Sequence, residues 1–120
     1  MHTGHVIEES CEAFVSDCHV RAAAELVNHA WDPVVLSALR LGPTRRSVLL
    51  RRIAGASHKA LTESIRRLAA RGLVARSSDD SRRDAALYAL TELGASFAHG
   101  PLAHLAEWAA AHQTELSATS

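Results

Sequence analysis

The sequence of 120 residues has only two cysteines, Cys11 and Cys18, and no long apolar run. Two cysteines cannot form the disulfide framework of a small secreted domain, so free thiols are expected. No stretch approaches the roughly 18 apolar residues of a membrane-spanning helix. The first twelve residues are acidic and lack the basic and apolar segments of a secretion signal. These absences predict a cytoplasmic protein that has no membrane partner.

Motifs for catalysis and for metal binding are also missing. The sequence contains no nucleophile motif, phosphate-binding loop or clustered carboxylates, so we predict that the protein is not an enzyme and uses no cofactor. Eight histidines raise the question of a metal site. His99 and His104 are five residues apart, however, which places them on different sides of a helix, and His2 and His5 belong to an N-terminal arm. No pair therefore has a convincing ligand geometry. We therefore expect no metal.

The composition is that of an ordinary globular domain, with 48% hydrophobic and 22% charged residues. The net charge is zero, yet the charges are segregated: residues 40–83 hold 12 of the 13 basic residues and 3 of the 13 acidic ones. A basic middle with acidic flanks predicts that one surface faces a polyanion. Chance clustering in an arginine-rich chain is the alternative interpretation.

Residues 57–72 have the pattern of an amphipathic helix within this basic segment. Ser57 is suited to cap its N-terminus, and Gly72 to end it in the left-handed conformation. Cations and hydrogen-bonding groups fill one side of the helical wheel, which suits a DNA groove, while an ordinary solvated face is the alternative. The apolar residues gather on the other side: Leu61, Ile65 and Leu68.

Two further helices are expected before this one. A short helix follows Asp17, and a second begins with Asp32 as its cap and Pro33 at the first helical position. The second helix is expected to be buried and to end at Gly42-Pro43. Its expected core residues are Val34, Val35, Leu36, Leu39 and Leu41.

Residues 44–53 are predicted to form another short helix, which a glycine-containing turn at 54–56 joins to residues 57–72. Val48, Leu49 and Ile53 are its expected core. Its arginines are expected to project outward: Arg45, Arg46, Arg51 and Arg52. Two short helices joined in this way, the second amphipathic and basic, are typical of a helix-turn-helix.

Two strand-like segments, 73–77 and 86–90, enclose a charged turn and predict a β-hairpin. A hairpin in this place is a wing, and its tip carries Arg82 and Arg83. A last helix starts at Thr91-Glu92 and is broken by Gly100-Pro101. The predicted fold class is therefore mainly α with a small β-hairpin wing (α+β), a winged helix-turn-helix.

Several motifs stand in the same order along the chain: Cys18 before the first helix, Trp31 before the second, Gly42-Pro43-x-Arg45, the run from Gly55 to Arg76, and Tyr88-x-Leu90-Thr91-Glu92-x-Gly94. Together they resemble the HxlR-type winged helix-turn-helix transcriptional regulators of bacteria, which are related to the MarR-type proteins. The resemblance implies a homodimer that binds a pseudo-palindromic operator in double-stranded DNA, with the terminal helices forming the dimer contact. It also implies that Cys18 senses oxidants, quinones or aldehydes; a small structural cysteine is the alternative.

The candidate DNA-binding residues form two sets. The set expected to face the bases or lie near them is Ser57, His58, Lys59, Thr62 and Arg66. The set expected at the DNA backbone and minor groove is Arg45, Arg46, Arg82 and Arg83. Arg67 and Arg71 are expected to be solvated or paired with Asp79 and Asp80.

We interpret the chain as a sequence-specific DNA-binding transcription regulator. The hypothesis is a homodimeric repressor that an effector releases, either a thiol-reactive compound or a small ligand. One structural domain would then comprise an N-terminal arm or dimerising segment (1–16), a DNA-binding domain (17–91) and a C-terminal dimerisation helix (92–120). The alternative is a winged-helix protein-protein interaction module that binds no operator.

Overall fold

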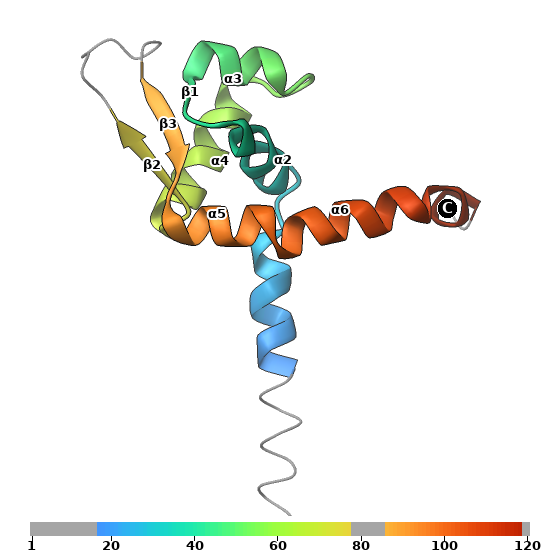
Figure 1. Cartoon of the computed structure of the whole chain (residues 1–120). Helices are drawn as coiled ribbons and strands as arrows, with labels where there is room; N and C mark the ends of the chain where they lie inside the picture. The colour runs from blue at the N-terminus through green and yellow to red at the C-terminus, as the bar shows by residue number, and fades with distance from the viewer. Residues whose placement is uncertain (1–16, 78–85, 119–120) are drawn as a thin grey trace, which may run out of the picture. The chain divides into compact units, whose positions relative to one another are not determined.

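The computed structural model describes residues 17–77 and 86–118, and the chain separates into two compact units between Ala30 and Trp31. In the first unit residues 17–26 are helical, which confirms the helix expected there (Figure 1). Within that helix Nη2 of Arg21 lies 3.0 Å from Oδ2 of Asp17. None of the helices described is long and apolar enough to cross a membrane.

The second unit contains the described strands and the other helices (Figure 1). Their order is α2 (Trp31–Ala38), a 3₁₀ turn η1 (Leu39–Leu41), β1 (Thr44–Arg45), α3 (Arg46–Arg52), α4 (His58–Ala70), β2 (Val74–Ser77), β3 (Leu87–Leu90), α5 (Glu92–His99), α6 (Pro101–Ala111) and α7 (Gln113–Ala118). The predicted winged helix-turn-helix, mainly helical with a small sheet, is confirmed.

The sheet has three antiparallel strands in the order β1-β3-β2, one more than the predicted hairpin. Thr44 pairs with Tyr88 in β3, so the expectation that Thr44 opens a helix is wrong. The reason is the pairing with a distant segment: the backbone of Arg45 is extended, and the amide of Arg46 donates to the carbonyl of Ala86 at 3.0 Å. The helix α3 therefore begins only at Arg46. The wing tip with Arg82 and Arg83 lies outside the described residues.

Both predicted ends of α4 are confirmed. The hydroxyl of Ser57 accepts a hydrogen bond from the amide of Ala60 at 3.0 Å, which caps the first turn. Gly72 follows the last turn with φ +76°, a conformation that glycine adopts without a Cβ penalty. The buried face of α4, which packs on α2, consists of Leu61, Ser64, Ile65 and Leu68.

The helix α2 differs from the prediction at both ends. It begins at Trp31, and Asp32 lies inside its first turn with only 2% of its surface exposed, so Asp32 does not cap the helix from outside. Leu41 was expected to be buried but is 78% exposed, because the 3₁₀ turn at the end of α2 directs it outward. Val34 is likewise exposed, whereas Val35, Leu36 and Leu39 form the expected core.

The helix α5 starts where the prediction placed it, because the hydroxyl of Thr91 accepts from the amide of Gly94 at 3.0 Å. It ends at Gly100, and Pro101 starts α6, so the predicted break is confirmed. Gly94 lies directly against the backbone of Leu73: a Cβ at Gly94 would stand 1.9 Å from the Leu73 carbonyl oxygen. Only glycine fits at this contact between Leu73, which follows α4, and α5.

Candidate nucleic-acid interface

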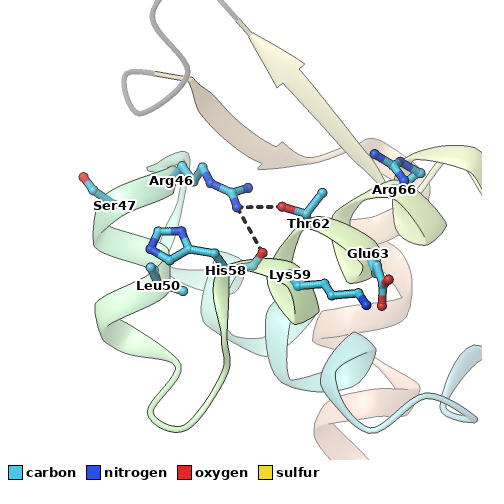
Figure 2. A pocket seen from close by; sticks show the side chains of 8 residues that line it. All are labelled: Arg46, Ser47, Leu50, His58, Lys59, Thr62, Glu63 and Arg66. Carbon is cyan, nitrogen blue, oxygen red and sulfur yellow. Dashed lines mark hydrogen bonds between the residues drawn. The ribbon is translucent and has the colours of Figure 1, made fainter.

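A groove with a volume of about 780 Å³ lies between α3 and α4, and we call it the α3/α4 groove (Figure 2). Its lining residues are Arg46, Ser47, Leu50, His58, Lys59, Thr62, Glu63 and Arg66. The face of α4 that lines the groove is opposite its buried apolar face. The structure thus brings four of the five predicted base-facing residues into one groove, and Ser57 caps the helix at the groove's end.

Arg46 does not project outward as predicted. Only 8% of its surface is exposed, and its Nη2 donates to the Thr62 hydroxyl at 2.7 Å and to the His58 carbonyl at 3.2 Å (Figure 2). Because α3 begins at Arg46, the side chain lies against the first turns of α4 rather than in solvent. Arg46 therefore joins α3 to α4, whereas Arg45, its neighbour in β1, is exposed as expected.

Arg52 is exposed, as predicted, but it also forms hydrogen bonds that the sequence did not predict. Its Nη1 donates to the Ala38 carbonyl at 3.1 Å and to the Thr44 hydroxyl at 3.3 Å. The side chain thus connects the end of α2 with β1. Arg51 is exposed and forms no hydrogen bond or ion pair with another described residue.

Lys59 and Arg66 are the two cations of the α3/α4 groove that have no partner in the described part of the chain. Both are exposed, and neither forms a hydrogen bond or ion pair with another described residue. The predicted set of DNA-binding residues did not include Ser47, Leu50 or Glu63. Glu63 is four residues after Lys59, so helical periodicity alone puts it on the same face. The contribution of α3 follows only from the packing of the two helices.

The buried side of α4 carries a polar network that sequence reasoning missed. The Asp32 carboxylate accepts from the Ser64 hydroxyl at 2.7 Å and from Nη2 of Arg67 at 2.9 Å. The hydrogen bond to Asp32 is the largest effect that raises the pKa of Arg67; burial opposes it, and the charges of Asp32 and Glu63 add to it. The prediction that Arg67 is solvated or paired with Asp79 or Asp80 is therefore wrong.

The remaining candidates lie elsewhere. Cys18 is an exposed free cysteine in the helical residues 17–26 of the first unit. Arg71 is exposed at the C-cap of α4. Among the described residues no group of three or more His, Cys, Asp or Glu side chains is arranged to hold a metal ion.

A comparison with known protein families identifies the family of this chain. The model of the HxlR-like helix-turn-helix family matches residues 26–117. The chain belongs to this family. One relative is the HTH-type transcriptional regulator YtfH of Escherichia coli (strain K12). It is 34% identical to this chain over 95 residues, which cover 79% of this chain and 75% of YtfH.

Solved structures agree with the HxlR-like assignment. A transcriptional regulator, YtfH from Salmonella typhimurium, superimposes with a TM-score of 0.71 at 31% identity, covering 83% of this chain and 88% of that one. The redox regulator HypR in its reduced form shares the fold with a TM-score of 0.75 at 21% identity, covering 82% and 97% of the two chains. This HxlR-like protein is thus a transcriptional regulator of the winged helix-turn-helix type.

Proposed function

We propose that this HxlR-like chain is a sequence-specific DNA-binding regulator that inserts α4 into the major groove of its operator. The observation that carries the proposal is the pair Lys59 and Arg66, two exposed cations without partners among the described residues on one face of a helix whose opposite face is buried. The B-DNA major groove admits an α-helix, and its guanine edges present acceptors that lysine and arginine bind. His58, Thr62 and Ser57 supply further hydrogen-bonding groups at the same face.

Contacts to the DNA backbone complete the proposal. The exposed side chain of Arg45 in β1, together with Arg82 and Arg83 of the predicted wing, supplies cations on both sides of α4 along the sequence. Arg46 stays in the fold, where it positions α4 through Thr62 and His58 rather than reaching for phosphate. Phosphate contacts from Arg45, Arg82 and Arg83 would fix the register of α4 on the DNA without reading the base sequence.

We also propose a homodimer on a pseudo-palindromic operator. Large apolar side chains on α5 and α6 are exposed: Leu93 at 61%, Leu105 at 51% and Trp108 at 53%. A second copy of the chain would bury them, and two-fold symmetry of the protein then matches two operator half-sites. Residues 92–120 would serve as the dimerisation segment, 17–91 as the DNA-binding part, and 1–16 as an arm or a further dimerising segment.

The test is a selection of duplexes from a random DNA library with the full chain, followed by binding titrations on the enriched sequence. We expect one enriched pseudo-palindrome, and we expect Arg66→Ala to weaken its binding at least tenfold. Arg71→Ala removes the same charge outside the α3/α4 groove and is the matched control, which should bind within about threefold of wild type. If the wild-type chain enriches no sequence, the proposal is overturned and the protein-protein interaction module becomes the better explanation.

The regulatory half of the proposal is that the protein acts as a cytoplasmic repressor and that Cys18 controls its release. The support is the exposure of Cys18, which leaves its thiol open to reagents; the likeness to HypR concerns the fold alone. Diamide would take two hydrogens from two Cys18 thiols and leave a disulfide between subunits. Diamide should release operator from wild type and from Cys11→Ser but not from Cys18→Ser. Release that persists in Cys18→Ser would contradict the thiol switch and favour a small-molecule effector.

A further inference from the structure

We infer that Glu63 reads the exocyclic amino group of a cytosine in each operator half-site. The inference rests on the proposed function and adds the chemistry of one base contact to it. Glu63 is the one acidic residue lining the α3/α4 groove, among three basic residues and a histidine from the described part of the chain. Figure 2 shows its carboxylate on the same side of α4 as the ammonium group of Lys59.

The interaction of Glu63 with the described part of the fold is electrostatic: its charge helps to raise the pKa of Arg67, one turn later. Glu63 is exposed, and it forms no hydrogen bond or ion pair with any other described residue. Lys59, one turn earlier, is equally without a described partner. Arg67, one turn later, gives Nε and Nη2 to the Asp32 carboxylate. The carboxylate is thus presented at the interface without a hydrogen bond or an ion pair to the described residues.

The chemistry of DNA restricts what this carboxylate can bind. The phosphates repel it, so its presence at the interface is unfavourable unless a donor on the DNA meets it. In the major groove the only donors are the N4 amino group of cytosine and the N6 amino group of adenine. Adenine also presents the acceptor N7 beside its amino group, which suits an amide better than a carboxylate. Cytosine is therefore the base that Glu63 matches.

The neighbours of Glu63 are consistent with a C·G pair. The guanine of that pair offers O6 and N7, which accept from lysine and arginine. Lys59 and Arg66 stand four residues before and three residues after Glu63, so all three share one face of α4. Glu63 thus supplies an acceptor for the amino group of cytosine. Lys59 and Arg66 supply donors for O6 and N7 of the paired guanine.

The experiment repeats the library selection with wild type, Glu63→Gln and Glu63→Ala. Wild type should enrich cytosine at one position in each half-site. Glu63→Gln should enrich adenine there, because glutamine binds N6 and N7 together, and Glu63→Ala should lose the preference at that position alone. Glu92→Gln removes an exposed acid of α5 outside the groove and is the charge-matched control, which should keep the cytosine.

A second experiment removes the exocyclic amino group of the cytosine itself. The enriched cytosine is replaced by 2-pyrimidinone, which lacks only the amino group, and binding is titrated. Wild type should lose about 5- to 150-fold in affinity, and Glu63→Ala should lose less than about twofold. An unchanged cytosine preference in both Glu63 variants, or equally tighter binding of Glu63→Ala to all sequences, would overturn the inference. The absence of any enriched sequence with wild type would instead overturn the proposed function.

Discussion

The carboxylate of Asp32 in α2 is held by the guanidinium of Arg67 in α4, with Nη2 2.9 Å from Oδ1 and Nε 3.1 Å from Oδ2. Asp32 is 2% exposed, and Ser64 donates a further hydrogen bond to the same carboxylate. The recognition helix is thereby fixed to α2 from its buried side, while Arg46 fixes it to α3 from the groove side. Arg46 and Arg67, two arginines of the basic segment, thus hold α4 in place.

Removing Arg67 should destabilise the protein strongly. Arg67→Met leaves the Asp32 carboxylate buried with Ser64 as its only described donor, and we expect a loss of about 3–5 kcal/mol in the free energy of unfolding. Urea unfolding at a fixed protein concentration measures it, because dimerisation would make stability concentration-dependent. The double variant Asp32→Asn/Arg67→Met should lose clearly less than the sum of the single variants. Additive losses would contradict a direct coupling of the two residues.

The pH dependence of that loss follows from the raised pKa of Arg67. A raised pKa in the folded state gives stability that is fully present below the unfolded value and disappears only as the pH rises through the folded value. The unfolded value of arginine is already strongly alkaline. The difference between wild type and Arg67→Met should therefore stay constant between about pH 7 and pH 9, and a steady decline across that range would be inconsistent with the arginine assignment.

Arg46 should matter for stability more than its exposed neighbour. Arg46→Met removes the donors to Thr62 and to the His58 carbonyl, and we expect a loss of about 1.5–3 kcal/mol in the free energy of unfolding. Arg45→Met removes the same charge from an exposed position and should change stability by about 0.5 kcal/mol or less. Thermal and urea unfolding of the two variants provide the comparison. Equal effects of the two substitutions would mean that Arg46 acts only as a surface charge.

The cap of α4 gives a prediction with its own internal control. Ser57→Ala removes the acceptor for the Ala60 amide and should lower the free energy of unfolding by about 1 kcal/mol. Ser57→Gly should cost only a few tenths of a kcal/mol, because glycine is tolerated at the N-cap. Urea unfolding distinguishes the two. A larger loss for Ser57→Gly than for Ser57→Ala would argue against the capping role.

Gly94 should be less replaceable than Gly72. Gly94→Ala places a Cβ against the Leu73 carbonyl, so α5 must move away from its contact, and we expect a loss above about 3 kcal/mol or failure to fold. Gly72→Ala meets no atom within 4 Å and is disfavoured only by its left-handed backbone, at about 1–2 kcal/mol. Unfolding curves of the two variants would be expected to differ accordingly. Similar curves would contradict the close approach at Gly94.

Local signals predicted most of the element order. The cap at Ser57, the end at Gly72, the cap at Thr91 and the break at Gly100-Pro101 are properties of a few neighbouring residues, and the structure confirms all four. The groove-facing side of α4 also followed from helical periodicity. These features need no knowledge of the rest of the fold.

The errors at Arg46, Arg67 and Asp32 share one cause, because the partners of these charged residues are distant in sequence. Periodicity assigns arginine and aspartate to the surface by default, yet Arg46, Arg67 and Asp32 are held by tertiary contacts. Asp32 and Arg67 are 35 residues apart, and the sequence around either residue does not predict that the two will pair. β1 was missed for the same reason, because a two-residue strand exists only through its pairing with β3.

The junction between α4 and α5 has a consequence for operator geometry. The Thr91 amide donates to the Leu73 carbonyl at 3.0 Å, and the Thr91 hydroxyl donates to the Gly72 carbonyl at 2.5 Å, beside the close contact of Gly94. The exit of the recognition helix and the entry of the terminal helices are thus one rigid corner. In a dimer joined through the terminal helices, that corner sets the separation of the two recognition helices, and with it the number of base pairs between half-sites.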